Sequence, residues 1–205
     1  MESLNNIIND IVNSMPFPIN YLILSIIGVV LLFTFFPLLG YIINKFEDFE
    51  FIGLTNLFGN KAATFIVNRL TFIGVITHEC AHATFAWVCG AKVSRIKLLT
   101  FFKDDELGSV QFIPGGGVIK QNLQLFFTSC APVIVNTSLS ILTIYYCKYI
   151  THWYFYILAG YLIISFINHA SMSKPDLNLY LKSAKVIIPF LIAITFLCMI
   201  LFRQV

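Results

Sequence analysis

Five apolar stretches, each long enough to form a helix, follow one another along the chain and are separated by shorter polar segments. They cover residues 20–43, 64–88 (with a start near Thr64 or Leu70), 123–146, 153–170 and 177–202. A helix needs about 20 apolar residues to cross a hydrocarbon core of about 30 Å, and most of these stretches approach that length. The pattern therefore predicts an all-α polytopic membrane protein with about five hydrophobic helical segments.

Two polar interruptions separate the first three stretches. Residues 44–63 carry lysine, aspartate and glutamate side chains, and we expect them to form a loop at the membrane interface. In residues 91–120 basic and apolar side chains alternate at roughly every second position, and an acidic turn leads to a second extended run at 108–114. This alternation predicts a small β-hairpin inserted between the second and third helices.

The composition is that of a membrane protein rather than of a soluble domain. The 205 residues are 58% hydrophobic, include 21 phenylalanines and have a mean hydropathy of +0.84, whereas only 11% are charged. Soluble domains carry roughly a quarter charged residues. A net charge of +3 also argues against a nucleic-acid partner.

We expect one membrane-embedded domain over residues 1–205, with an N-terminal anchor helix at 20–43 and a C-terminal helix at 177–202. Residues 1–18 lack the basic start of a cleavable signal peptide. The lysines and arginines of residues 91–120 place the hairpin, and with it the N-terminus, on the cytoplasmic side by the positive-inside rule.

The second apolar stretch contains the sequence His78-Glu79-Cys80-Ala81-His82. Two histidines four positions apart lie on one face of a helix and can bind one Zn²⁺, and the glutamate between them can then take a proton from bound water. Cys80 points about 200° away from His78, at about 100° per residue, so we exclude it as a ligand. Ionisable groups inside a bilayer are costly and usually functional, which favours a catalytic interpretation.

A catalytic zinc ion needs three protein ligands, so a third residue must join the two histidines. Asp176 is an isolated acid at the break between the last two apolar stretches, where non-helical backbone can line a polar cavity. It can equally serve the first turn of a helix that Ser173 caps. His169 and His152 are the other candidates, although a lone histidine near a helix end is more often hydrogen-bonded than metal-bound. His169 can also support a ligand by a hydrogen bond without contacting the metal itself. The sequence leaves these alternatives open.

This arrangement resembles the site-2 protease family of intramembrane zinc metallopeptidases, and more closely its small bacterial members. The resemblance covers residues 64–180, the expected catalytic core, and rests on four features in chain order. These are the His-Glu-x-x-His sequence in a membrane helix, a glycine-containing β segment, the element Ala131-Pro-Val-Ile-Val-Asn136, and a distal aspartate. In the third feature, alanine replaces the glycine of the family's Gly-Pro-x-x-Asn pattern, and one extra residue precedes the asparagine. In the fourth feature, the aspartate stands in Lys-Pro-Asp-Leu and is not followed by the glycine that is usual in the family.

The resemblance implies a zinc metalloendopeptidase with one Zn²⁺ per chain. The family's metal ligands and catalytic glutamate are matched by His78, His82, Asp176 and Glu79, respectively. Asn136 and His169 would then support the ligands or position the substrate. The implied partners are the lipid bilayer and a membrane protein or membrane-associated peptide as substrate, and the implied location is a bacterial cell membrane. The oligomeric state does not follow from the sequence.

A transmembrane substrate hides its peptide bonds in intrahelical hydrogen bonds, so it must unwind before cleavage. An exposed strand edge can pair with the unwound segment, and we expect this edge at Gly108, Ser109, Val110 and Gln111. A purely structural hairpin that covers the bundle is the alternative. Two other functions stay open: a membrane zinc protease whose third ligand is a glutamate, for which Glu106 is the available residue, and a non-proteolytic metal-binding membrane scaffold.

Overall fold

The computed structural model describes residues 6, 17–98 and 107–201. In chain order these residues form α2 (Ile19–Phe58), α3 (Asn60–Thr64), the π-helical segment η1 (Phe65–Leu70), α4 (Phe72–Val88), β1 (Lys92–Lys97), β2 (Ser109–Ile113), α5 (Val118–Cys147), α6 (Trp153–Asn168) and α7 (Lys174–Leu201). The predicted helical architecture with one small hairpin is confirmed within this part of the chain.

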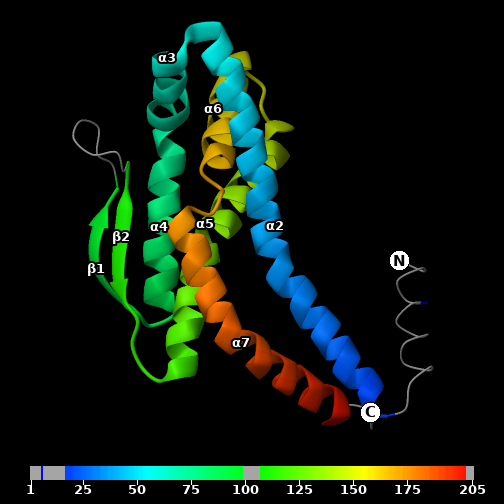
Figure 1. Ribbon diagram of the computed structural model, residues 1–205. Coiled ribbons are helices and arrows are strands. Elements are labelled where there is room, and N and C mark those ends of the chain that lie inside the picture. The colour runs from blue at the N-terminus through cyan, green and yellow to red at the C-terminus, as the bar shows by residue number, and fades with distance from the viewer. Residues whose placement is uncertain (1–5, 7–16, 99–106, 202–205) are drawn as a thin grey trace.

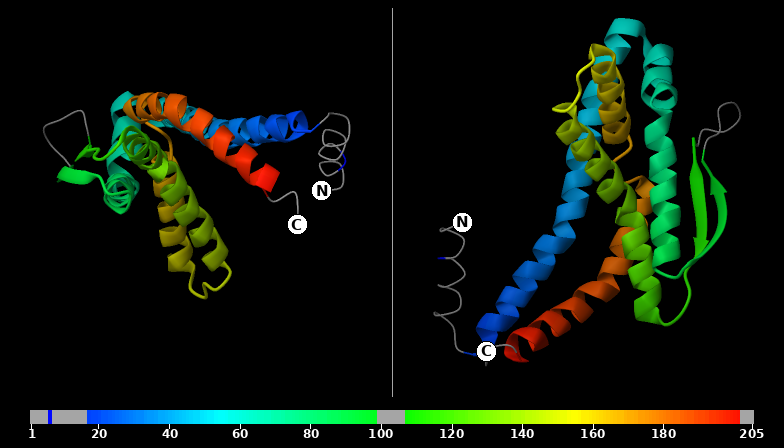
Figure 2. Two further views of the ribbon diagram at one scale, coloured as in Figure 1. Left: turned by 90° about the horizontal axis from the view of Figure 1, so that it is seen from below. Right: turned by 180° about the vertical axis from the view of Figure 1, so that it is seen from behind.

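The helices pass back and forth along one long direction of the molecule. α2 runs from one end to the other, α4 returns beside the hairpin, α5 runs away again, and α6 and α7 return (Figures 1 and 2). α6 and α7 run in the same general direction, so the break between them, residues 169–173, lies near the middle of the molecule. The start of α2 and the end of α7 lie together, as the 3.6 Å contact of Ser25 Oγ with Met199 Sδ shows.

Residues 44–63 are almost entirely helical, so the loop that the sequence predicts there is wrong. α2 continues through its charged residues to Phe58 and ends at Gly59, whose φ of 80° is readily adopted by glycine alone. Lys45 and Asp48 form an exposed ion pair of 3.2 Å, three positions apart on this helix. The charged side chains do not interrupt the backbone hydrogen bonds of the helix.

Among the described residues, three helices, α2, α5 and α7, are long and apolar enough to cross a membrane, whereas the sequence predicts five such segments. α6 is apolar but has 16 residues, because the helix ends before the break at 169–173. α4 has 17 residues, because η1 and the non-helical Thr71 interrupt the stretch that begins at residue 64. Hydropathy identifies these segments but not the points at which the helical geometry fails.

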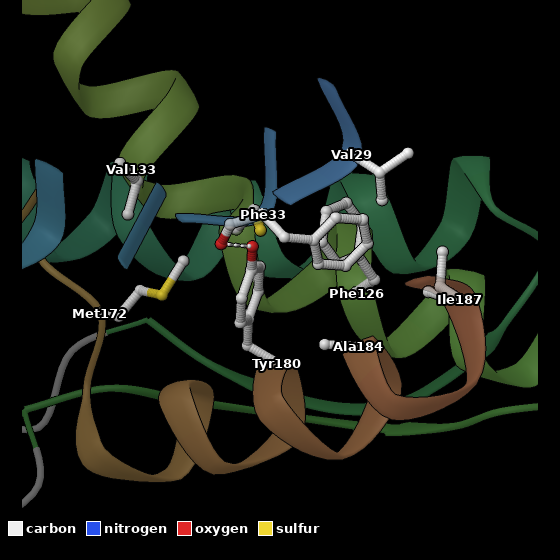
Figure 3. Packing of buried hydrophobic residues seen from close by; sticks show 9 residues of the cluster. Val29, Phe33, Phe126, Val133, Met172, Tyr180, Ala184 and Ile187 are labelled. Atoms are coloured by element: carbon white, nitrogen blue, oxygen red, sulfur yellow. Dashed lines mark hydrogen bonds between the residues drawn. The ribbon is translucent and has the colours of Figure 1, made fainter. Parts of the chain in front are cut away.

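A hydrophobic core joins α2, α5 and α7 (Figure 3). The rings of Phe33, Phe126 and Tyr180 pack with centroids 4.9 to 6.0 Å apart. The hydroxyl of Tyr180 donates a hydrogen bond of 2.6 Å to the carbonyl of Phe33. Because Tyr180 lies one turn after Asp176, this core fixes the first turns of α7, where the candidate ligand sits.

α4 and α6 approach closely at Gly74. A Cβ atom at this position would lie 1.8 Å from the carbonyl oxygen of Ser165, so only glycine permits the contact. The N–H of Gly74 donates to Ser165 Oγ (2.8 Å), and that hydroxyl donates to the carbonyl of Thr71 (2.8 Å). Gly74 stands one turn before His78, so the close approach brings the end of α6 beside the first histidine.

The hairpin has a bulge that sorts its side chains between two faces. β1 and β2 are antiparallel, and the register shifts between Val93 and Arg95, which leaves Ser94 as the extra residue. Residues directly opposite each other share a face, so Val93 and Ile96 lie with Phe112 and Val110 on one face. The other face carries Lys92, Arg95 and Lys97. The bulge explains why the alternation in the sequence is only approximate.

Candidate metal centre

α4 presents two histidines and a glutamate on its buried side. The rings of His78 and His82, one turn apart, have centroids 4.8 Å apart, and their Nε2 atoms lie 3.1 Å from each other. Glu79 and His82 are buried, and His78 is partly buried. The two imidazole nitrogens therefore face each other in a site largely closed to solvent.

The hydrogen bonds of the two rings select one tautomer. His78 Nδ1 lies 2.8 Å from the carbonyl of His169, and His82 Nδ1 lies 2.8 Å from the carbonyl of Thr128. A carbonyl can only accept, so each Nδ1 carries a proton and each neutral ring leaves a free lone pair on Nε2. Two lone pairs 3.1 Å apart repel each other unless a proton or a metal cation lies between them, and metal-binding histidines have this arrangement.

Asp176, in the first turn of α7, brings a carboxylate to the same place. Its Oδ1 lies 3.4 Å from Nε2 of His82, and its Oδ2 lies 4.0 Å from Nε2 of His78. The donor atoms of the three residues lie within 4.8 Å of one another, so the group can hold a metal ion. Two donor atoms that each lie about 2.0–2.1 Å from one tetrahedral zinc ion are about 3.3 Å apart. The distance between the two Nε2 atoms, 3.1 Å, and that between His82 and Asp176, 3.4 Å, are close to this value.

Ser173 fixes the carboxylate of Asp176 by a reciprocal cap. The hydroxyl and the N–H of Ser173 both donate to Oδ2 of Asp176, the latter at 3.2 Å, and the N–H of Asp176 donates back to Ser173 Oγ at 3.3 Å. This is a helix N-cap, and it leaves Oδ1 directed towards His82. The two roles that the sequence offers for Asp176, helix cap and candidate ligand, are therefore compatible.

The break between α6 and α7 supplies backbone rather than a side-chain ligand. The backbone carbonyl of His169 accepts a hydrogen bond from His78. The side chain of His169 lies outside the donor group, with its Nε2 3.0 Å from Oγ1 of Thr71. His152 lies at the start of α6, exposed and stacked on Tyr154 with ring centroids 5.3 Å apart, and it does not belong to the group either.

Asn136 is fully buried on α5 and stands behind the histidines. Its amide donates to the carbonyl of His169 (2.7 Å) and to the carbonyl of Gly74 (3.3 Å). The first of these carbonyls also receives the N–H of His78. Asn136 therefore links α4, α5 and the α6–α7 break, and it steadies the acceptor that orients His78.

A cavity of about 460 Å³ opens beside the donor group. Its lining includes the ligand candidates and Glu79, together with Val110 and Phe112 of β2 and Leu179 of α7. A larger cavity of about 940 Å³ lies between α2 and the start of α7, and it contains none of the donor group. Ser173 lines both cavities, so the larger one reaches the back of the Asp176 cap.

No protein-family model, no curated protein and no solved structure gives a significant match to this chain. The resemblance to site-2 proteases therefore rests on the chain's own residues.

Three of the four hairpin residues predicted to bind a substrate, Gly108, Ser109 and Val110, line this cavity, whereas Gln111 is exposed and does not. Ser109, Val110 and Gln111 belong to β2, and Gly108 immediately precedes it. β2 pairs with β1 along one edge, and its other edge has no strand partner among the described residues. Glu106, the ligand of the alternative zinc protease, lies outside the described residues.

Two contributors to the site were missed at the level of sequence, the carbonyl of Thr128 and the close contact at Gly74. A backbone carbonyl leaves no trace in residue type, so no signal could have revealed Thr128. Gly74 did leave one, because a glycine one turn before the first histidine of a helical site marks a place where another chain segment can approach.

Proposed function

We propose that this chain is an integral membrane zinc metallopeptidase that hydrolyses peptide bonds of membrane-associated substrates. The observation that carries the proposal is the convergence of His78, His82 and Asp176 on a cavity that Glu79 also lines. Two imidazoles and one carboxylate, with an open side for water, are the donor set of hydrolytic zinc sites. Imidazole and carboxylate together also favour zinc over calcium or magnesium, which prefer oxygen ligands alone.

Membrane insertion is supported by the surface of the long helices. α2, α5 and α7 expose large apolar side chains such as Leu31 (64%), Ile141 (62%) and Leu197 (55%), which a soluble protein would bury. The break at residues 169–173 agrees with this interpretation. Non-helical backbone at membrane depth is tolerated where it is buried in protein or lines a polar cavity, and here it faces the metal group.

A zinc ion held by these three residues would polarise a peptide carbonyl and lower the pKa of a bound water molecule to about 7. Glu79 is the general base in this proposal, because it lines the same cavity as the donor group and stands between the two histidines in the sequence. It accepts a proton from the attacking water and returns it to the leaving amine. The carbonyls of His169 and Thr128 keep both histidines in the tautomer that binds metal.

The cavity suits a peptide in extended conformation. The carbonyl of Gln111 faces β1, where it accepts from Ser94 Oγ, so the backbone groups of Val110 point to the unpaired edge. A substrate segment that pairs with β2 at Val110 would satisfy its exposed backbone groups while its peptide bonds pass the donor group. Val110 and Phe112 line the cavity on this side, so apolar substrate residues are favoured there.

The metal assignment is tested by the zinc content of the purified protein in detergent. We expect about one zinc per chain in the wild type, and much less in Asp176→Ala and in His78→Ala. His152→Ala is the matched control, because this exposed histidine lies outside the donor group and its loss should leave the zinc content unchanged. Full zinc occupancy in Asp176→Ala would rule out Asp176 as a ligand.

The reaction is tested with Glu79→Gln, which keeps the size of the side chain but cannot accept the proton. Fluorescein-labelled casein is a suitable probe, because it is unfolded and needs no unwinding. We expect Glu79→Gln to retain zinc and to lose about 10²–10⁴-fold in cleavage rate, whereas Glu50→Gln on α2 cleaves like the wild type. Cleavage that survives in Glu79→Gln would exclude the mechanism. The wild type could also bind zinc but fail to cleave casein, while wild-type and Glu79→Gln membranes contain the same intact proteins. That result would indicate the non-proteolytic metal-binding scaffold instead.

A further inference from the structure

Gly108 lies against Glu79 with no room for a side chain of its own. A Cβ atom on Gly108 would be 2.6 Å from Cγ of Glu79, and 3.1 Å from both Cδ and Oε1. Ordinary contacts between carbon atoms are about 3.5–4.0 Å long. The backbone at Gly108 therefore forms part of the surface on which the Glu79 carboxyl group rests.

We propose that Gly108 is a positioning residue for Glu79 and that it couples substrate docking on β2 to the orientation of the general base. The inference rests on the proposed function and extends it to a residue that binds neither metal nor water. Gly108 directly precedes Ser109, the first residue of β2 and the start of the proposed docking edge. The docking edge and the wall behind the base are thus consecutive parts of one backbone.

The surroundings of Glu79 show why its orientation needs such a wall. The side chain borders two separate spaces, the cavity of about 460 Å³ at the metal group and a smaller one of about 160 Å³. The smaller cavity is lined by Val75, Leu107 and His169, and Gly108 borders both spaces. A shift of Gly108 therefore changes the room available to the carboxylate on both sides.

Docking of a substrate strand would restrict the backbone at Gly108. Ser109 is already paired with Lys97 on the β1 side, and a second strand on the free edge would hold the backbone of β2 from both sides. The adjacent Gly108 is then fixed as well. The base is consequently held most firmly when a peptide lies beside it, so that binding energy from the docked strand contributes to catalysis.

The kinetic test compares Gly108→Ala with Gly115→Ala in zinc-loaded protein acting on fluorescein-labelled casein. Gly115 follows the other end of β2, and a Cβ atom there meets nothing within 4 Å. We expect kcat of Gly108→Ala to fall about 10–100-fold, because a displacement of about 1 Å at a catalytic group can cost about 10²-fold. Its zinc content stays at the wild-type level, and Gly115→Ala stays within about twofold in kcat. An unchanged kcat with a raised KM would overturn the proposal, since that pattern indicates docking alone.

A second measurement examines the contact without reference to activity or metal. The five native cysteines are first replaced by serine, and Glu79→Cys is combined with Gly108→Cys or, as the control, with Gly115→Cys. Copper–phenanthroline oxidation should link positions 79 and 108 and leave 79 and 115 unlinked, as peptide mass spectrometry reports. Absence of the 79–108 link overturns the contact. If the link forms but the wild-type protein cleaves nothing, the proposed function fails and the positioning role fails with it. If the wild type cleaves and Gly108→Ala cleaves equally well, the positioning role fails alone.

Discussion

Each residue of the donor group uses one polar atom towards the site and has another held from behind. His78 and His82 are fixed through Nδ1 by backbone carbonyls, and Asp176 is fixed through Oδ2 by Ser173. The donor atoms therefore converge before any ion arrives, and the cost of ordering these side chains is met during folding. Such outer contacts typically change metal affinity about 10–100-fold when they are removed.

Ser173→Ala tests this support directly. The substitution removes the hydroxyl that donates to Asp176 Oδ2 and that accepts from the N–H of Asp176. We expect zinc affinity, measured by competition with a chromophoric chelator, to fall about 10–100-fold, and stability to fall by about 1 kcal/mol through loss of the N-cap. Ser138→Ala, at an exposed position on α5, is the matched control and should change neither quantity. Unaltered zinc affinity in Ser173→Ala would mean that Ser173 only caps the helix and does not support metal binding by Asp176.

At this scale the sequence reveals what is local and leaves open what depends on folding. His78, Glu79 and His82 are recognisable because one helix turn brings them together whatever the rest of the chain does. Asp176 stays one of several candidates in the sequence, because 94 positions separate it from His82 and no pattern states where the chain returns. The structure adds the missing information as two distances, 3.4 and 4.0 Å.

Among the structural elements, the path formed by α6 and α7 departs most from the expectation. The sequence identifies two apolar stretches with a polar break, and the structure contains both helices within a few residues of the predicted bounds. Hydropathy does not say whether the chain reverses at such a break. Here it does not reverse, because α6 is held against Gly74 of α4 and the start of α7 is held by the Tyr180 contact with α2. Hydropathy is equally uninformative for residues 44–63, where the charged residues predict a loop but the chain continues as a helix.

Gly74→Ala tests the contact that sets this path. The added methyl group would lie 1.8 Å from the Ser165 carbonyl, so α4 and α6 must separate, and the bonds of Gly74 and Asn136 weaken with them. We expect a loss of several kcal/mol in unfolding free energy, above the range of about 1–3 kcal/mol for overpacking by small groups, together with reduced zinc content. Gly160→Ala is the matched control on α6, where a Cβ atom meets nothing within 4 Å. It should stabilise the helix by about 0.5–1 kcal/mol. Thermal unfolding in detergent measures the stability of both variants. If Gly74→Ala were as stable as Gly160→Ala, the close approach of α4 and α6 at Gly74 would not be needed for stability.

The start of α2 and the end of α7 lie at the same end of the molecule. Towards this end α4 also ends and α5 begins, whereas the α5–α6 connection lies towards the opposite one (Figures 1 and 2). The donor group lies between these ends, because α4, α5 and the α6–α7 break all contribute to it at intermediate positions along their length. A bilayer that covers α2, α5 and α7 would therefore enclose the donor group, and the cavity at β2 would be its opening.

This arrangement makes a prediction about topology that differs from a count of hydrophobic stretches. Five full membrane spans would place the two termini on opposite sides, but α6 and α7 together make a single return path, so both termini should lie on the same side. Epitope tags fused to each end should both be cleaved, or both be protected, when protease is added to sealed membrane vesicles. A tag inserted after Ile150, in the α5–α6 connection, is the control and should show the opposite accessibility. Termini of opposite accessibility would mean that α6 and α7 cross the membrane separately, and the break at 169–173 would then lie at a membrane surface instead of beside the metal group at membrane depth.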